Sequence, residues 1–166
     1  MKTTLLTPET DENAVKTAAE LIRAGEVVGM PTETVYGLAA NALNGEAVKK
    51  IFLAKGRPQD NPLIVHIADF EQIYDLCPAV PPQAKQLAEA FWPGPLTLIL
   101  EKSDEVPYGT TGGLDTVAVR MPSDSIAREL IRAAGGYVSA PSANTSGRPS
   151  PTAAEHVRED LDGKIE

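Results

Sequence analysis

The side chains best suited to hold an anion are two cations at the end of an expected helix. Lys55 and Arg57 follow the helical pattern of residues 46–54, and a glycine and a proline fix the backbone around Arg57. Basic residues at this place also complement the helix dipole, which is a purely structural explanation. The rigid backbone and the nearby amide of Asn61 favour a site that grips phosphate groups.

Two hydroxyl-rich segments follow short apolar strands. Residues 31–37 (PTETVYG) come directly after the expected strand 27–30, and the polar loop SAPSANTSGRPSP begins within the expected strand 137–140. Thr32 and Glu33 suit the N-cap and first turn of a helix, so a helix start is the structural interpretation of the first segment. Backbone N–H groups at such a start also suit a carboxylate or phosphate. The second segment has the composition of an anion-binding nest, and equally of an ordinary surface loop.

Two further polar side chains lie inside apolar strands. His66 interrupts the expected strand 63–67, and Arg120 ends the expected strand 116–120. A histidine in such a strand is more often a hydrogen-bonded structural residue than a catalyst. Arg120 either reaches solvent or presents a bidentate fork to a carboxylate at the edge of the sheet. The pattern leaves both questions open.

Helical segments alternate with short apolar strands along the chain. Helices are expected at residues 12–24, 46–54, 69–76, 82–91 and 124–134, with a further strand at 96–100. Thr152 and Glu155 form the pattern of a capping box that opens a last helix. This alternation predicts one α/β domain, 1–166, with a twisted, largely parallel or mixed open sheet flanked by helices. Strands 27–30, 116–120 and 137–140 each end at a proline, and we expect these ends to gather at one ligand-binding edge.

Composition narrows the class of partner. The chain has 166 residues and a net charge of −8, which argues against general nucleic-acid binding and for a small anionic partner. One cysteine and two histidines provide no convincing zinc site or catalytic triad. The P-loop pattern is not found, so any nucleotide is held without one. The sequence contains no apolar run long enough to span a membrane and no secretory signal at its start, which predicts a cytoplasmic location.

Four motifs in a fixed order together resemble the YrdC-like family of threonylcarbamoyl-AMP synthases. They are PTETVYGL from Pro31, KGRP from Lys55 with NPL from Asn61, FWPGPLT from Phe91, and SAPSAN from Ser139 with Ser146-Gly147. The similarity runs from about Ala18 to the end of the chain. It implies a concave pocket for ATP, L-threonine and bicarbonate, with Mg²⁺ assisting. Threonine and bicarbonate would form a carbamate that attacks the α-phosphorus of ATP, so no covalent enzyme intermediate is needed.

The resemblance also implies roles for individual residues. Residues matching the threonine side are Thr34, His66, Arg120 and, through its backbone, Ala140, with Arg120 taking the carboxylate. Residues matching the nucleotide side are Lys55, Arg57, Asn61, Thr116, Ser142, Asn144 and Ser150, with Lys55 and Arg57 stabilising charge. Thr32 and Tyr36 would line the pocket between the two sides. The product would pass to the machinery that transfers threonylcarbamoyl groups to tRNA.

The chain departs from the family in one respect. Members continue into a further strand with a Gly/Ser-Thr-Val segment and then an Arg-Pro-Gly, and this sequence contains neither. We therefore expect an incomplete ligand shell and self-association through an exposed sheet edge. Two alternatives are an RNA-binding module of the same fold and the carbamoyl-adenylate-forming domain of hydrogenase maturation. The acidic balance disfavours the first, and the single cysteine disfavours the second.

Overall fold

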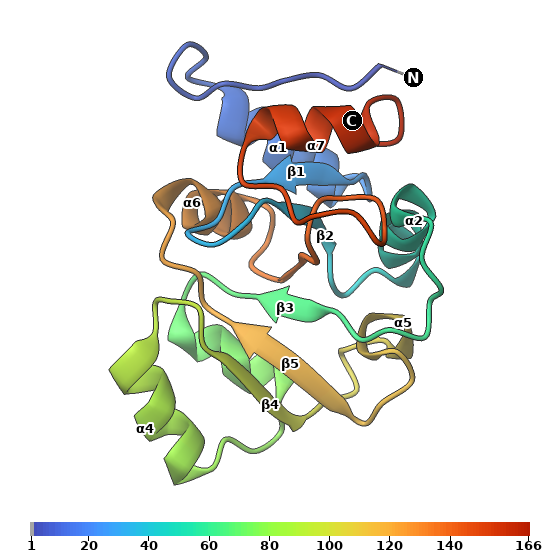
Figure 1. The fold of residues 1–166 in the computed structure, drawn as a ribbon. Coiled ribbons are helices and arrows are strands. Elements are labelled where there is room, and N and C mark those ends of the chain that lie inside the picture. The colour runs from blue at the N-terminus through green and yellow to red at the C-terminus, as the bar shows by residue number, and fades with distance from the viewer. Residues whose placement is uncertain (1) are drawn as a thin grey trace.

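The computed structural model describes residues 2–166, which form helices packed on one six-stranded sheet (Figure 1). The order across the sheet is β1-β2-β6-β3-β5-β4. The strands are β1 (Val28–Met30), β2 (Gly37–Asn41), β3 (Ile64–His66), β4 (Thr97–Glu101), β5 (Thr116–Arg120) and β6 (Val138–Ser139). Only β3 and β5 pair in parallel, and the four other pairs are antiparallel. The expected α/β class with a mixed open sheet is confirmed.

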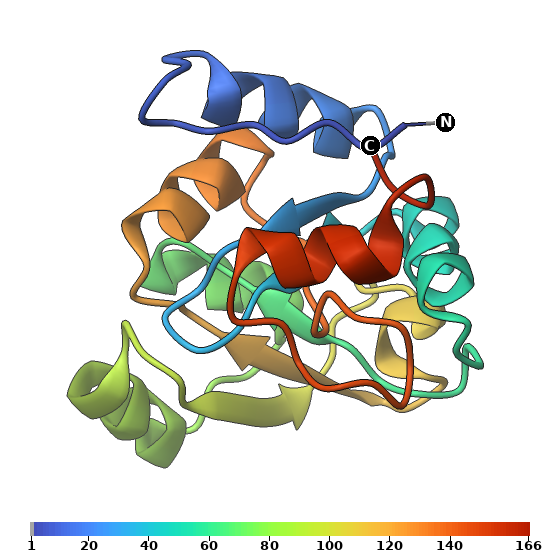
Figure 2. The same ribbon diagram turned by 45° about the horizontal axis from the view of Figure 1, so that its top comes forward.

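Helices cover the two faces of the sheet unequally. α1 (Ala14–Arg23) and α6 (Ser125–Ala133) bury one face of β1, β2 and β6. The opposite face is covered by α2 (Gly45–Lys55) and α7 (Ala154–Leu161) over β2, and by α3 (Ile73–Leu76) and α4 (Pro82–Phe91) over β3 and β5. Figure 2 shows β1 between α1 and α7. A 3₁₀ turn (Phe70–Gln72) precedes α3, and the short α5 (Tyr108–Thr111) precedes β5.

One part of the sheet carries no helix on the face that α1 and α6 cover elsewhere. His66 and Arg120 are paired neighbours in β3 and β5, and Val138 of β6 is aligned with His66 on the same face. Farther along this face, Ala118 is half-buried, and Ile99 of β4 is 67% exposed. Among residues 2–166, the helix layer on this face therefore ends before β3, β5 and β4.

Strand β2 was not predicted from the sequence, and the prediction of a helix start at residues 31–37 is wrong. The Thr32 hydroxyl does accept the backbone N–H groups of Thr34 and Val35 at 3.2 Å, as a helix cap would. The chain then enters β2 instead of a helix. Residues Gly37–Ala40 are all buried, so the strand lacks the alternation of polar and apolar residues that identifies strands in sequence.

Strand direction corrects a second expectation. β6 runs antiparallel to β3, whereas β5 runs parallel to β3, so β5 and β6 end at opposite ends of the sheet. β1 and β6 both pair antiparallel with β2 and therefore run the same way. The three proline-terminated strands do not meet at one edge. The loop 31–36 crosses from the end of β1 to Arg120 at the end of β5. This crossing brings the predicted site residues Thr34 and Arg120 into contact.

The predicted last helix is confirmed as α7, but its capping box is wrong. The N-cap residue is Ala153, and no side chain caps the helix start. The Thr152 backbone N–H instead donates to Nδ1 of His156 at 3.3 Å. The other predicted helices and strands are found within a few residues of their expected bounds.

Candidate functional site

Arg120 is a buried cation held by three separate contacts. It ends β5 and is 8% exposed. Its Nε donates to the carbonyl of Gly94 at 3.2 Å, and its Nη1 donates to the Thr34 hydroxyl at 3.3 Å. Its Nη2 forms an ion pair with Glu33. Burial lowers the pKa of Arg120, but a guanidinium remains charged at any physiological pH. Two predicted threonine-side residues, Thr34 and Arg120, are thus in direct contact.

Glu33 contacts Arg120, although the sequence placed Glu33 only in the first turn of an expected helix and predicted no site role for it. One carboxylate oxygen faces Arg120, and the other accepts from the backbone N–H and the hydroxyl of Ser123 and from the N–H of Asp124. The Ser123 hydroxyl lies at 2.7 Å and the Asp124 N–H at 3.3 Å. The only sequence signal was an acid within the PTETVYG segment, which did not indicate a partner 90 residues away.

His66 is a neutral, buried neighbour of Arg120. The residue is 2% exposed, and its Nδ1 lies 3.2 Å from the carbonyl oxygen of Ile64. Since a carbonyl can only accept, Nδ1 carries the proton and Nε2 has a free lone pair. Burial lowers the pKa of His66 to about 4, and the bond to Ile64 opposes this only partly. His66 is therefore an acceptor, not a cation, at neutral pH.

The remaining residues of this face mark its extent. Ala140 follows β6, and its backbone N–H donates to the Ile64 carbonyl at 3.2 Å. A Cβ at Gly37 would lie 2.9 Å from the Cβ of Ala140, so glycine permits this close approach. Thr116 begins β5 on the same face as Arg120, four residues earlier. At about 3.3 Å per residue the two are separated by ~13 Å, a distance that suits a ligand larger than an amino acid.

Lys55 is committed to the polar loop that follows β6. The residue is 3% exposed, and its ammonium donates to the carbonyls of Ser142 and Asn144 at 2.5 and 2.8 Å and to the Asn144 side-chain oxygen at 3.2 Å. These contacts use all three of its donors. Burial, and then the charge of Arg57, lower the pKa of Lys55 to about 8 against the opposing effect of Asp160. In this structure Lys55 holds the loop, and its predicted phosphate contact stays a prediction.

Arg57 differs from Lys55 although only one residue separates them. Gly56 ends α2 in the left-handed conformation with φ of 62°, and the Arg57 N–H returns to the Phe52 carbonyl at 3.0 Å. The Arg57 side chain is half-buried, and among residues 2–166 it makes no side-chain hydrogen bond or ion pair. Asn61 has one side-chain bond, to Asp60 at 3.3 Å. Arg57 therefore has its donors free for an anion.

The two polar loops lie side by side, as Figure 2 shows in front of the sheet. The Tyr36 N–H donates to the Pro151 carbonyl, and the Ala143 N–H donates to the Tyr36 carbonyl, both at 2.8 Å. Thr32 and Thr34 share a hydroxyl contact of 3.0 Å. Asn144 is 5% exposed, and its amide donates to the Arg148 carbonyl at 2.6 Å, whereas Ser150 is exposed. The expected pocket-lining residues Thr32 and Tyr36 thus lie between the predicted threonine side and the predicted nucleotide side.

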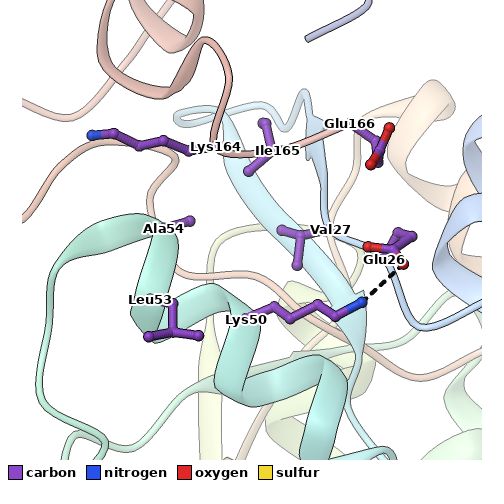
Figure 3. Close-up of a pocket in the computed structure, with 8 residues that line it drawn as sticks. All are labelled: Glu26, Val27, Lys50, Leu53, Ala54, Lys164, Ile165 and Glu166. Atoms are coloured by element: carbon purple, nitrogen blue, oxygen red, sulfur yellow. Dashed lines mark ion pairs between the residues drawn. The ribbon is translucent and has the colours of Figure 1, made fainter. Parts of the chain in front are cut away.

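Two cavities lie elsewhere on the surface. One, of about 390 Å³, lies between α2 and the last residues and is lined by Glu26, Val27, Lys50, Leu53, Ala54, Lys164, Ile165 and Glu166 (Figure 3). The other, of about 380 Å³, includes Ser150 but no other predicted site residue. Neither cavity includes Arg120 or His66, and the Thr34 side chain already contacts Arg120. Among residues 2–166, no helix is long and apolar enough to cross a membrane, and no cluster of three metal-ligating side chains is found.

Comparison with known proteins decides the family. Residues 20–166 match the Sua5/YciO/YrdC family, which carries the description "Telomere recombination". A threonylcarbamoyl-AMP synthase of Pyrococcus abyssi is 60% identical over 156 residues, which are 94% of this chain and 46% of the relative. A threonylcarbamoyl-AMP synthase of Bacillus subtilis is 59% identical over 157 residues, or 94% of this chain and 45% of the relative.

The chain belongs to the Sua5/YciO/YrdC family.

Solved structures agree with this membership and with the expected fold. The crystal structure of P. abyssi Sua5 complexed with L-threonine has a TM-score of 0.92 at 60% identity, covering 94% of this chain and 46% of that chain. Full-length HypF in a phosphate- and nucleotide-bound form has a TM-score of 0.79 at 26% identity, covering 91% of this chain and 23% of that chain. The sequence is thus much closer to Sua5 than to HypF. It spans about half the length of the Sua5-type relatives that it matches.

Proposed function

We propose that this Sua5/YciO/YrdC domain makes threonylcarbamoyl-AMP from L-threonine, bicarbonate and ATP, with release of pyrophosphate. The observation that carries the proposal is the grouping of Thr34, from loop 31–36, with Arg120 and neutral His66 at a part of the sheet that no helix covers on this face. The P. abyssi relative of the same fold was crystallised with L-threonine, which supports L-threonine as a ligand of this fold. The product would serve threonylcarbamoyladenosine formation in tRNA, in the cytoplasm, through the transfer machinery.

The threonine half of the site would recognise the amino acid by charge and hydrogen bonding. Arg120 would bind the carboxylate, because a guanidinium presents paired donors that match two carboxylate oxygens. Thr34 and the Ala140 backbone would line the rest of the amino acid. The free lone pair of His66 Nε2 can accept a hydrogen bond from the amino group, which must be uncharged to attack bicarbonate. The resulting carbamate forms with loss of one water.

The nucleotide half would bind ATP through the residues of the second loop and α2. Arg57 and Asn61 would contact phosphate oxygens, with Thr116, Ser142, Asn144 and Ser150 around the nucleotide. The carbamate oxygen attacks the α-phosphorus, the bond to the β-phosphate oxygen breaks, and pyrophosphate leaves with the electron pair. Positioning and charge neutralisation would lower the barrier without a covalent enzyme intermediate.

Mg²⁺ would accompany ATP. This ion prefers oxygen ligands and keeps several waters, so it is usually held by substrate phosphates and few protein groups. The hydroxyl and amide oxygens of Ser142 and Asn61 fit that preference. When bound, Mg²⁺ would neutralise charge on the phosphates, which is also the effect expected of Arg57.

Pyrophosphate release tests the proposed function. We expect release that requires both L-threonine and bicarbonate, with L-serine weaker for want of the methyl contact and L-valine much weaker for want of the hydroxyl. Release that is independent of threonine would contradict the proposal. So would an absence of turnover combined with salt-dependent RNA binding, which would favour the RNA-binding alternative. Self-association through a sheet edge stays a prediction, which sedimentation checks directly.

A further inference from the structure

The carboxylate of Glu33 joins the loop after β1 to the end of β5 and the start of α6, two consecutive elements about 90 residues later in the chain. Glu33 lies in the loop after β1, its partner Arg120 ends β5, and its other partners Ser123 and Asp124 precede α6. Asp124 is itself the N-cap of α6, because its carboxylate accepts the Ala127 N–H at 2.9 Å. The Glu33 oxygen that faces Ser123 is thus fixed by groups anchored to a helix. The position of the other oxygen, which faces Arg120, follows from that anchoring.

The donors of Arg120 can be counted against these contacts. A guanidinium has five N–H groups: one on Nε and two on each terminal nitrogen. Nε donates to Gly94 and one Nη1–H to Thr34, and the buried Nη2 forms an ion pair with Glu33 but has no hydrogen-bond partner among the described residues. At least one donor is therefore left on each terminal nitrogen. Two donors are the number that a bidentate carboxylate contact needs.

We infer that Glu33 is a positioning residue for substrate recognition: it fixes the rotation of Arg120 so that the two remaining donors face the substrate carboxylate. This inference rests on the proposed function and adds a residue that the family resemblance did not assign. Glu33 also offsets the charge of Arg120, which is 8% exposed. A buried cation without a partner is costly, so Arg120 would otherwise turn toward solvent or another acceptor.

The contacts of Glu33 argue against a different role, in which its carboxylate occupies the substrate position and leaves when threonine arrives. Three N–H or O–H donors from Ser123 and Asp124 hold one of its oxygens independently of Arg120. Departure would leave these donors without their acceptor. A residue fixed in this way persists beside the bound substrate, whereas a competing occupant would have to be released.

The two roles predict opposite effects of Glu33→Gln on L-threonine binding. A glutamine keeps one oxygen for Ser123 and Asp124, but its NH₂ group then faces Arg120. This NH₂ group cannot accept a hydrogen bond from the guanidinium. A positioning role therefore predicts threonine binding at least tenfold weaker, with ATP binding changed less than twofold. A competing occupant predicts tighter threonine binding. Calorimetric titration of the 166-residue chain with each ligand measures both.

Two further variants keep the test decisive. Glu33→Asp retains the charge and should recover part of the affinity, and Ser123→Ala removes one of the anchoring donors and should weaken threonine binding two- to fivefold. Glu46→Gln removes an exposed carboxylate paired only with Lys49 on α2 and should change nothing. Unchanged or tighter threonine binding in folded Glu33→Gln overturns the inference but leaves the proposed function standing. If Glu33→Gln does not fold, unchanged or tighter binding in both Glu33→Asp and Ser123→Ala has the same meaning. If the unaltered chain binds no L-threonine, the proposed function fails and the inference fails with it.

Discussion

The two proposed halves of the candidate site, one for threonine and one for the nucleotide, differ in the contacts of their buried cations. In the threonine half, Arg120 is balanced by Glu33 and keeps donors for a ligand. In the nucleotide half, Lys55 has given all three donors to the loop that follows β6. Arg57, two residues along the chain, has no such partner among residues 2–166. A buried cation can therefore be part of the ligand surface or part of the support that shapes it, and only its contacts distinguish the two.

The largest effect is expected in the threonine half. Arg120→Lys keeps a positive charge but cannot reproduce the fork that contacts Gly94, Thr34 and a carboxylate together. We expect kcat/KM for L-threonine to fall by a factor that corresponds to a loss of about 3 kcal/mol in transition-state stabilisation. This loss is near the middle of the range for truncated charge pairs. Binding of ATP should change little, which separate titrations with each ligand would measure. A variant that lost ATP instead would reverse our assignment of the two halves.

A smaller effect is expected at Arg57 in the nucleotide half. Arg57→Ala should weaken ATP binding by about 2 kcal/mol, because a partly desolvated phosphate contact would be lost. The free energy of unfolding should change little, since the side chain makes no hydrogen bond or ion pair within the described residues. Calorimetry with ATP and denaturant unfolding would measure the two quantities. Unchanged ATP affinity would remove Arg57 from the phosphate site.

Lys55 should show the opposite pattern, with its main effect on stability. Lys55→Met leaves the buried carbonyl of Asn144 and the Asn144 side chain without their donor, which should cost about 1–3 kcal/mol. Lys49→Met, which breaks only an exposed pair with Glu46, should cost less than about 1 kcal/mol. Urea unfolding of both variants makes the comparison. Equal, small effects would show that Lys55 is not a support for the loop.

The pH dependence of stability gives an independent reading of Lys55. Its pKa is about 8 in the folded chain and 10.5 in the ordinary reference state, so the unfolded chain binds more protons between these values. Stability contributed by this group therefore rises as pH increases from about 8 to 10.5. The difference between unaltered chain and Lys55→Met should show that rise. A flat or falling difference would mean that Lys55 is not desolvated.

Much of the fold follows from local sequence pattern, and the contacts of the site mostly do not. α1, α2, α4 and α6 have amphipathic patterns or clear end signals, and β3 and β5 are short apolar runs. β2 is alanine-rich and buried on both faces, so it lacks any alternation. β1 and β6 run the same way and β5 runs opposite to both, which the three similar strand ends did not indicate.

Long-range pairing explains why the site was only partly predicted. Lys55 and Arg57 have the same charge in the same motif, but their difference depends on carbonyls 87 and 89 residues away from Lys55. The partners of Glu33 are as distant, at 90 and 91 residues. A single sequence indicates which side chains can hold an anion. It does not indicate which of their donors remain free after folding.

The last prediction concerns His66 and sharpens the contrast between the halves. Burial lowers its pKa to about 4 from an ordinary value of 6.5, so the unfolded chain binds more protons between these two values. The free energy of unfolding should therefore fall as pH decreases from about 6.5 toward 4, with at most the slope that one extra bound proton in the unfolded chain produces. Titration of His66 should not change the affinity for threonine between pH 6 and 8, because the imidazole is already neutral there. An NMR titration of the His66 ring, assigned with His66→Gln, should show no protonation above about pH 5. Protonation near pH 6.5 would show a solvated ring, and His66 would then be a cation beside Arg120 in weakly acidic solution, unable to accept a hydrogen bond from the amino group of threonine.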